Sequence, residues 1–424
     1  MPCAGDGDAA GGPARARGRV AVRRTRRIVQ FGFLALTLVG VFVVGGNAER
    51  WCPFGGVEAL YTYLHEGNLL CSLGVSNFYI LAAVLVSTLL LRRVFCGYMC
   101  PIGTLSEWIG RAAARLKLRP RTVPVQADRA LSMLKYVVLG VILFITYKAS
   151  ELLFRTFDPC YALISRHGED ITFWAYVVAG AIVIGSVFIT MPFCRWLCPL
   201  AAVLNPFSRI GLTRIRRNEE TCISCGKCAR VCPMAIPVDT VREVTAARCL
   251  SCMECVEACP PKAGGSVTWG PPRFLGRRWP QAALVTIMLM CVGIAVAASY
   301  AFPIASFINV QGEPPAQTES VRFRVAGLTC RGSANLFAYY LKRDDMFAIP
   351  GYMKIEAWPG PGGGEARITF DPSQTSVEAI QQAISEAYFD ATGNLWRPSP
   401  FEIEGYDPLA APQTTQPDAE AVTP

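Results

Sequence analysis

The chain has 424 residues, of which 52% are hydrophobic and 17% are charged, and its formal net charge is +9. This length allows two or three domains, and the high hydrophobic fraction indicates that much of the chain does not face water. Histidine occurs only twice and no C-x-x-C-H sequence is present, which argues against a multihaem cytochrome.

Residues 1–27 are rich in Gly, Ala and Asp and then in arginine, with few apolar side chains that could pack. This composition predicts a disordered cytoplasmic tail. Arginine-rich segments are also typical of nucleic-acid binding. Here a membrane segment follows at once, so we attribute the charge to membrane topology and expect no nucleic-acid partner.

Five stretches are apolar and long enough to cross a bilayer, which takes about 20 residues in a helix. They are residues 28–46, 76–94, 131–149, 171–190 and 282–303. Most lysines and arginines lie in residues 1–27, 92–130 and 191–280, and few lie in 47–75 and 150–170. Because positive loops stay inside, we expect a bacterial inner-membrane protein with a cytoplasmic amino terminus and middle segment. The region from residue 304 onwards is then periplasmic or extracellular.

Outside the cysteine runs at 222–260, the turn C-x3-C-P occurs twice, each time directly after an even-numbered span. Its cysteines are Cys96 and Cys100 in the first copy and Cys194 and Cys198 in the second. Spans one and two therefore resemble spans three and four. Parallel repeats of this kind are related by an axis along the membrane normal, with functional sites at their interface. The symmetry predicts that the two turns face each other just inside the membrane.

Four facing thiols allow three interpretations. They could hold a further Fe–S centre or another metal, or they could form two dithiol–disulfide pairs that pass electrons. Alternatively, they are buried small side chains, and the prolines only end helices. We favour a redox or metal-binding role for these four cysteines.

Three further cysteines, Cys52, Cys71 and Cys160, lie in the outer loops. In an oxidising periplasm two of them could form a disulfide. Cys52 and Cys160 each occur in a short element with proline that precedes a C-x3-C-P turn, so both are also candidate metal ligands.

The densest cysteine pattern lies between residues 222 and 260. Two runs of C-x2-C-x2-C-x3-C-P follow each other, the spacing of a bacterial ferredoxin with two [4Fe–4S] clusters. In that pattern the fourth cysteine of each run binds the other run's cluster. We therefore assign cluster one to Cys222, Cys225, Cys228 and Cys259, and cluster two to Cys249, Cys252, Cys255 and Cys232. Zinc sites usually come as separated C-x2-C pairs, and disulfides would need an oxidising compartment.

The carboxy-terminal region has the periodicity of a β-α-β-β-α-β domain after a polar linker at 311–319. Its strands are predicted near 321–325, 351–357, 366–370 and 399–403, and its helices near 333–341 and 376–387.

The whole chain is thus predicted to be an α-helical membrane protein of about five spans, with a cytoplasmic two-cluster ferredoxin insert and an α+β, ferredoxin-like outer domain. The predicted regions are a basic tail (1–27), a four-helix membrane domain (28–210), a two-cluster ferredoxin domain (211–270), a fifth transmembrane helix with its flanks (271–310), the outer domain (320–405) and a disordered tail (406–424).

The C-x3-C-P turns, the outer Cys52-Pro53-Phe54-Gly55-Gly56 and the twin-cluster segment together resemble the membrane polyferredoxin-like proteins of the NosR/NapH type, which include the CcoG-type proteins. The resemblance covers roughly residues 28–300. It implies electron transfer between a cytoplasmic or quinol donor and a membrane or periplasmic acceptor. It also implies cluster ligation by the cysteines of the two runs and a redox role for those of the C-x3-C-P turns.

The outer domain is similar to a heavy-metal-associated domain. Gly327-Leu328-Thr329-Cys330-Arg331-Gly332-Ser333 matches the G-M-T-C-x-x-C loop, except that Ser333 replaces the second thiol. Soft ions such as Cu(I) prefer thiolates. Cys330 is therefore a candidate copper ligand that lacks its usual partner, and the alternative is a degenerate docking module.

These observations predict an oxidoreductase-type electron carrier in the inner membrane, with reduction of a metal ion as a candidate activity. Electrons would pass from the cytoplasmic or quinol donor towards a periplasmic metal ion such as Cu(II), or towards a metalloenzyme. The alternative is a metal-binding or assembly factor for a periplasmic or membrane metalloenzyme, in which the clusters sense redox state. Transport of the metal itself is disfavoured because Cys291 is the only thiol near mid-membrane.

Overall fold

The computed structural model describes residues 13–43, 52–66, 76–118, 123–149, 158–159, 162, 173–260, 265–271, 279–302, 304–343, 347–360, 362–390 and 395–406. Cys71, Cys160 and most of the predicted tail at 406–424 lie outside these residues. The chain divides into two compact units, residues 1–62 with 75–302 and residues 63–74 with 303–424.

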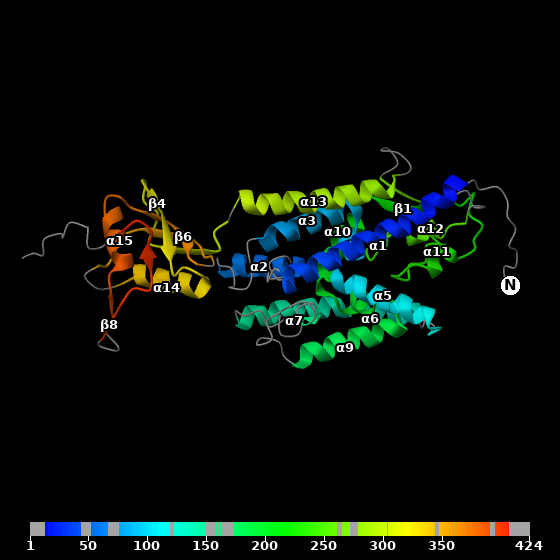
Figure 1. The fold of residues 1–424 in the computed structure, drawn as a ribbon, viewed down its shortest axis with the longest axis horizontal. Helices are drawn as coiled ribbons and strands as arrows, with labels where there is room; N and C mark the ends of the chain where they lie inside the picture. The colour runs from blue at the N-terminus through cyan, green and yellow to red at the C-terminus, as the bar shows by residue number, and fades with distance from the viewer. Residues whose placement is uncertain are drawn as a thin grey trace, which may run out of the picture. The chain divides into compact units, whose positions relative to one another are not determined.

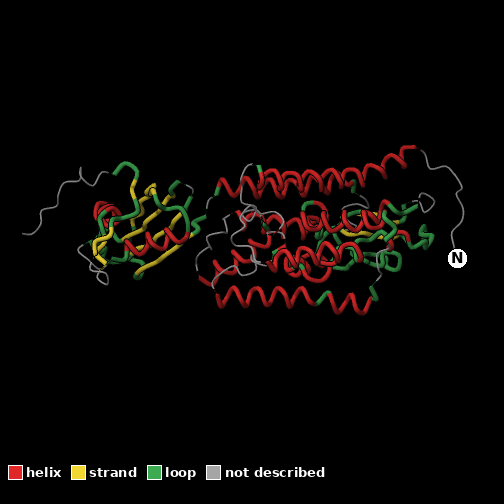
Figure 2. Tube along the Cα trace, turned by 60° about the horizontal axis from the view of Figure 1, so that its bottom comes forward, coloured by secondary structure: helices red, strands yellow, loops and turns green. Residues whose placement is uncertain are grey.

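The first unit is built from helices that lie roughly alongside one another (Figures 1 and 2). They are α1 (Pro13–Phe42), α2 (Pro53–Glu66), α3 (Ser76–Leu91), α4 (Val94–Tyr98), α5 (Pro101–Arg115), α6 (Val125–Leu131), α7 (Leu134–Ala149), α9 (Phe173–Phe188), the π-helical turn η3 (Phe193–Leu197), α10 (Pro199–Ile210) and α13 (Gln281–Ala301). The helix α13 packs along α3 (Figure 1).

All five predicted spans are helical, but they differ in length. Among the described residues, Arg23–Phe42, Val125–Lys148 and Gln281–Ala301 are long and apolar enough to cross a membrane. The helices α3 and α9 are equally apolar but have 16 residues each. At 1.5 Å per residue such a helix is about 24 Å long, less than the ~30 Å hydrocarbon core. Each of these short helices is followed by a C-x3-C-P turn.

The prediction of a disordered tail over residues 1–27 is wrong for its second half, because α1 begins at Pro13. The reason is electrostatic rather than hydrophobic. Arg23 and Arg26 form ion pairs with glutamates of other elements, so the polar end of α1 has partners inside the unit.

The two halves of the membrane region exchange helices, in the sense that each half packs its amphipathic helix against the apolar helix of the other half. Each half has the same order of elements, namely an apolar helix, a short cysteine-bearing turn and an amphipathic helix. The amphipathic helix α5 of the first half packs against α9 of the second, and α10 packs against α3. Ser106 of α5 and Ser186 of α9 share a hydrogen bond of 2.7 Å. The exchange supports the predicted repeat.

The ferredoxin segment follows α10 and is closed by a short antiparallel pair of strands. These strands, β1 (Arg214–Arg217) and β2 (Val267–Gly270), pair Arg214 with Gly270. Between them lie two one-turn helices, α11 (Lys227–Arg230) and α12 (Glu254–Glu257). A single hydrophobic core contains buried cysteines from both the ferredoxin runs and the C-x3-C-P turns.

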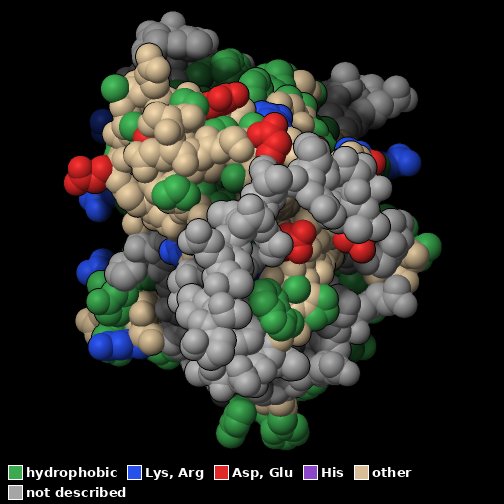
Figure 3. All heavy atoms as spheres, turned by 90° about the vertical axis from the view of Figure 1, so that its left-hand side faces the viewer, with side chains coloured by type: hydrophobic (Ala, Val, Ile, Leu, Met, Phe, Trp, Pro, Cys, Tyr) green, Lys and Arg blue, Asp and Glu red, His purple; other side chains and the backbone are tan. Residues whose placement is uncertain are grey.

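The second unit contains a five-stranded sheet of order β3-β5-β6-β4-β9 (Figure 2). Its elements are β3 (Phe307–Gln311), β4 (Glu319–Ala326), α14 (Arg331–Leu341), β5 (Met353–Trp358), β6 (Gly364–Phe370), α15 (Val377–Ser385) and β9 (Glu402–Ile403), with a small hairpin of β7 (Tyr388–Asp390) and β8 (Leu395–Arg397). From β4 to β9 the order of the main elements is the predicted one. The strand β3 falls in a stretch where the sequence predicts none. On the face in Figure 3, acidic and basic side chains are interspersed with hydrophobic ones.

Candidate iron–sulfur site and the adjoining cysteine turns

The two cysteine runs share an unusual backbone. Ser224 and Ser251, which hold equivalent places in the runs, have φ of 49° and 50°. Gly226 and Met253 are also equivalent and have φ of 67° and 60°. Non-glycine residues rarely adopt positive φ, and where they do so the surrounding structure enforces it, often at functional sites. The repeated conformation curls each C-x2-C-x2-C loop in the same way.

A small pocket lies inside the second run. Its cysteines are Cys232, Cys249, Cys252 and Cys255, and its other walls are largely apolar. These are the four ligands that the sequence predicts for cluster two, including the one contributed by the first run. The set of sulfur donors around the pocket therefore matches the four ligands of one [4Fe–4S] cluster.

The remaining four cysteines, predicted for cluster one, lie nearer the surface. Cys222 and Cys225 are half-buried, whereas Cys228 and Cys259 are buried. Hydrogen bonds from the backbone of Ser224 and the side chain of Arg217 hold the pKa of Cys222 below its usual value. By contrast, burial raises the pKa of Cys252 to about 12, so this thiol needs a bound cation to become an anion at neutral pH.

Among the described residues, no group of three or more His, Cys, Asp or Glu side chains is close enough to hold a single metal ion. The assignment of the eight ferredoxin cysteines to two clusters rests on their spacing in the sequence.

The C-x3-C-P turns also match each other locally. Cys100 and Cys198 precede helices α5 and α10 with nearly identical backbone angles, φ/ψ of −63°/119° and −61°/116°. Each is followed by proline at the first helical position, where the missing N–H costs nothing. Cys96 and Cys194 lie one turn earlier and are buried. Cys194 is within electrostatic reach of Cys96, Cys100 and Cys198, so the two turns lie in the same part of the unit.

A buried arginine accompanies these thiols. Arg93 is 0% exposed and directs its Nη2 at the Cys96 sulfur, 3.9 Å away. Its charge also reaches Cys194 and Cys198. Its Nη1 lies 3.4 Å from the side-chain amide of Asn205, and its Nε has no hydrogen-bond partner. Within the described residues Arg93 forms no ion pair with a carboxylate, and the thiols are the groups that its charge affects most.

The first C-x3-C-P turn touches the second cysteine run directly. A Cβ atom on Gly97 would lie 3.0 Å from the carbonyl oxygen of Leu250, the residue after Cys249. Arg92 spans the same boundary, because its guanidinium donates to the carbonyl oxygens of Val244, Thr245 and Ala246 at 2.5–3.1 Å. The predicted cluster two is thus packed against the turn.

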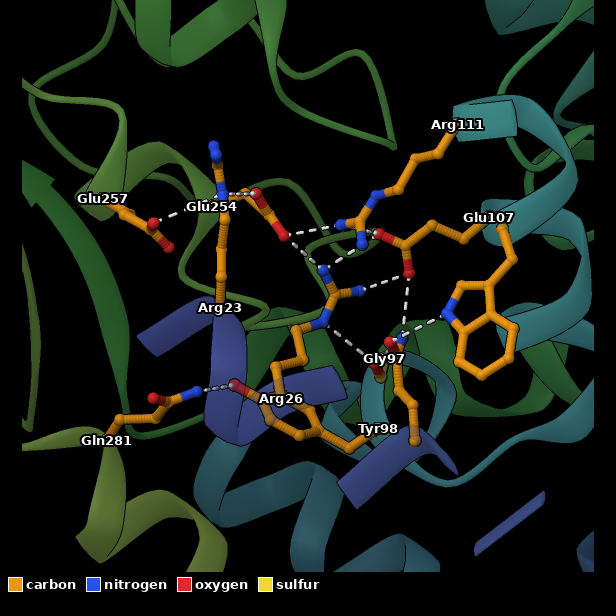
Figure 4. Close-up of polar contacts among 11 residues, drawn as sticks. Arg23, Arg26, Gly97, Tyr98, Glu107, Arg111, Glu254, Glu257 and Gln281 are labelled. Atoms are coloured by element: carbon orange, nitrogen blue, oxygen red, sulfur yellow. Dashed lines mark hydrogen bonds and ion pairs between the residues drawn. The ribbon is translucent and has the colours of Figure 1, made fainter. Parts of the chain in front are cut away.

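A charged network links the same two elements (Figure 4). Arg26 of α1 donates to Gly97 O in the turn, to Glu107 of α5 and to Glu254 of α12. Arg111 pairs with both glutamates at 2.7 Å, and Arg23 pairs with Glu254 at 3.2 Å. These arginines hold the pKa of Glu254 below its usual value although burial acts in the opposite direction.

The second turn has an equivalent link through Asp128. Its carboxylate accepts hydrogen bonds from Arg195 at 2.5 Å and from Trp196 at 2.9 Å, both within the turn. It also pairs with Arg248, the residue before Cys249. Both C-x3-C-P turns are therefore tied to the second cysteine run by buried carboxylates.

The remaining candidate metal ligands are the cysteines predicted to lie on the outer side of the membrane. Cys52 lies at the start of α2 within electrostatic reach of Asp158, and burial raises its pKa to about 12. Cys160 is outside the described residues. Cys330 is exposed, and Ser333 Oγ accepts hydrogen bonds from the backbone N–H groups of Thr329 and Cys330 at 2.8 and 2.9 Å. The serine thus caps α14 where a second thiol was expected. Met353, whose thioether could have served as a second soft metal ligand beside Cys330, is buried in the core.

Sequence reasoning missed the charged residues around the cysteines. Arg26, Arg92 and Arg93 were read as topology signals, and Asp128, Glu107 and Glu254 were not singled out. Gln30 could have revealed the network. It lies one turn beyond Arg26 in an apolar stretch, and its side chain donates to Gly97 O and Glu107.

Two sequence families match the chain. One, described as a 4Fe-4S binding domain, matches residues 73–121 and 171–218, which contain the two C-x3-C-P turns. The other, described as a 4Fe-4S dicluster domain, matches residues 214–260. No solved structure matches the chain significantly.

Several curated proteins are similar to about half of the chain. The putative electron transport protein YccM of Escherichia coli is 36% identical over 47% of this chain and 57% of its own length. The uncharacterized protein MJ0750 of Methanocaldococcus jannaschii is 31% identical over 48% of this chain and 82% of its own length. The regulatory protein NosR of Pseudomonas aeruginosa is 30% identical over 50% of this chain and 30% of its own length. The chain thus covers less than two thirds of the first and third of these proteins.

Proposed function

Because the chain belongs to the NosR/NapH-type family of membrane ferredoxin-like electron-transport proteins, we propose that it passes electrons outward across the bacterial inner membrane. The donor is a cytoplasmic protein or a quinol. The acceptor is a periplasmic metal ion such as Cu(II), or a metalloenzyme. The observation that carries the proposal is the packing of the first C-x3-C-P turn on the second cysteine run.

The eight ferredoxin cysteines would hold two [4Fe–4S] clusters, with the assignment that the spacing predicts. Bound there, the clusters supply storage and transfer of single electrons. Cluster one would lie near the surface, because Cys222 and Cys225 are half-buried, and it is accordingly the entry point for electrons. The pocket of cluster two lies deeper and adjoins the turns.

The four C-x3-C-P cysteines are the next redox-active groups on this route. Burial and the neighbouring thiols raise the pKa of Cys194, and the buried positive charge of Arg93 acts in the opposite direction, so an anionic state there would depend on Arg93 and on what the thiols bind. Either a thiolate pair or a thiolate-bound metal would satisfy this charge. The short lengths of α3 and α9 place the turns closer to the outer surface than full-length spans would.

On the outer side the route includes Cys52 and the second unit. With one exposed thiol and a serine in the second position, the loop of Cys330 is suited to docking of a partner or to transient contact with a soft metal ion. We assign this unit a role in presenting the acceptor.

The test uses anaerobically purified protein in sealed liposomes of known insertion sidedness. An impermeant reductant is added on the ferredoxin side, and Cu(II) with a Cu(I)-specific chelator is trapped in the lumen. The proposal predicts luminal Cu(I) chelate with the wild type and its loss in the Cys96/Cys100/Cys194/Cys198→Ser variant. A Cys291→Ser variant is the matched control, because this thiol lies on α13 and belongs to neither cysteine set.

Two outcomes would contradict parts of the proposal. Reduced clusters without luminal Cu(I) would exclude direct copper reduction and point to a metalloenzyme acceptor. Unchanged chelate formation in the quadruple variant would remove the C-x3-C-P cysteines from the route.

A further inference from the structure

Arg26 is the most deeply buried charged group of the network in Figure 4. Its side chain is 2% exposed, against 43% for Arg23 and 31% for Arg111. All three of its guanidinium nitrogens donate hydrogen bonds. Nε reaches Gly97 O at 3.2 Å, Nη1 reaches Glu107 and Glu254 at 2.9 Å each, and Nη2 reaches Glu107 at 2.6 Å.

The acceptors of Arg26 belong to the two cysteine elements and to the helix between them. Gly97 is the residue after Cys96, and Glu254 lies between Cys252 and Cys255. The positive charge of Arg26 is also within electrostatic reach of Cys252 itself. Arg26 therefore stands directly beside the pocket lined by the predicted ligands of cluster two.

The network contains as many arginines as glutamates, but its arginines differ in how deeply they are buried. Arg23, Arg26 and Arg111 face Glu107, Glu254 and Glu257. Solvent screens the charges of Arg23 and Arg111, which are partly exposed, much more than that of Arg26. The field at the cluster pocket is therefore governed by the buried cation and its closest carboxylates.

We propose that Arg26 sets the reduction potential of cluster two. Reduction adds one electron to a centre that already carries four thiolates, and a buried positive charge nearby stabilises the reduced form. Net charge and hydrogen bonding are two of the properties that tune iron–sulfur potentials. A raised potential would hold the electron at the cluster that adjoins the first C-x3-C-P turn. This inference rests on the proposed function, because it requires cluster two to be bound by Cys232, Cys249, Cys252 and Cys255.

The experiment is an equilibrium redox titration of the full-length, detergent-solubilised protein. Dithionite supplies electrons through soluble mediators, and EPR spectroscopy follows each reduced cluster. In Arg26→Gln the ratio of reduced to oxidised cluster two at a fixed ambient potential should fall by roughly tenfold, which is a downward shift of about 59 mV for one electron. Arg26→Lys keeps the charge and should recover most of the wild-type ratio. Cluster one should keep its ratio in both variants.

Two neighbours provide matched controls. Gln30 donates to the same acceptors, Gly97 O and Glu107, without any charge, so Gln30→Leu tests the hydrogen bonds alone. Arg23 shares the partner Glu254 but is largely exposed, so Arg23→Gln tests loss of a screened charge. Both controls should change the ratio less than twofold.

If Arg26→Gln fails to assemble cluster two because Glu107 and Glu254 lose their most buried partner, Arg26→Gln/Glu107→Gln keeps the wild-type net charge and should show a smaller fall in the same direction. An unchanged ratio in a cluster-loaded Arg26 variant would overturn the proposal. So would an equal effect of Gln30→Leu. The titration measures potential at equilibrium and not transfer across the membrane. A failure of the liposome test with a shifted potential would therefore count against the proposed function alone.

Discussion

Arg92 and Arg93 are adjacent in the sequence, yet their guanidinium groups lie beside different sets of cysteines. Arg92 donates to Val244 O and is within electrostatic reach of Cys249 in the second ferredoxin run. Arg93 points at Cys96 in the first C-x3-C-P turn. Two neighbouring residues at the end of α3 thus connect the two sites.

Because Arg93 has no carboxylate partner among the described residues, we expect Arg93→Met to change the stability of the protein in opposite directions in two backgrounds. In the wild type, Arg93→Met should destabilise the protein by about 3–5 kcal/mol, because the anionic charge of the thiol site loses its buried counter-ion. In the Cys96/Cys100/Cys194/Cys198→Ser background, the same substitution should stabilise, since Arg93 is then the uncompensated charge. The measurement is thermal unfolding in detergent of the wild type and the quadruple Cys→Ser variant, each with and without Arg93→Met. Destabilisation of equal size in both backgrounds would show that the thiols carry no charge.

Gly97 is predicted to require the absence of a side chain. A Cβ there would meet the Leu250 carbonyl oxygen at 3.0 Å and its Cβ at 3.3 Å, so Gly97→Ala should push the turn away from the second run. We expect a loss of about 1–3 kcal/mol and slower Cu(I) formation in liposomes at unchanged iron content. The control is Gly180→Ala in α9, where nothing lies within 4 Å of the new Cβ. If both variants behave like the wild type, the contact does not limit transfer.

Asp128→Asn should break the link between the second C-x3-C-P turn and the second cysteine run. Arg195 is 6% exposed and would lose its carboxylate, which costs about 3–5 kcal/mol for a buried pair. Arg242→Gln, which removes the ion pair between this exposed arginine and Glu219, is the comparison and should cost at most about 1 kcal/mol. Thermal unfolding monitored by the 4Fe–4S absorbance reports on the unit that holds both residues. Equal effects of the two substitutions would argue against a structural role for Asp128.

Ser333→Cys should convert the outer loop into a dithiol site. Two thiolates at C-x-x-C spacing select Cu(I), whereas the wild type has Cys330 alone. We expect competition with a Cu(I) chelator to appear in the variant. Because Ser333 Oγ caps the backbone of Thr329 and Cys330, the substitution should also cost about 0.5–2 kcal/mol. Ser376→Cys alters another helix cap and controls for the added thiol. Wild-type competition as strong as that of Ser333→Cys would mean that one thiol suffices.

The cysteine chemistry and the element order could be read from the sequence, because thiolate spacing and apolar periodicity are local properties. The pocket bounded by Cys232 and the second run follows from the C-x3-C-P ending of the first run. The proximity of the two turns followed from the repeat. The partners of Arg26 and Asp128 could not be predicted, since they come from segments roughly 70–230 residues away. A run of arginines beside an apolar helix satisfies the positive-inside rule whether or not one of them is buried.

The exchange of α5 and α10 between the halves also bears on how the protein is made. A ribosome releases the first turn, Cys96 to Cys100, long before α9 is available to pack on α5. Until then Arg93 has neither the second pair of thiols nor Asn205 beside it. The thiol site can therefore close only after residue 210 has emerged, and the ferredoxin runs are synthesised immediately afterwards. Chain order thus places both C-x3-C-P turns before the ferredoxin runs, whereas α13, which packs along α3, is synthesised after them.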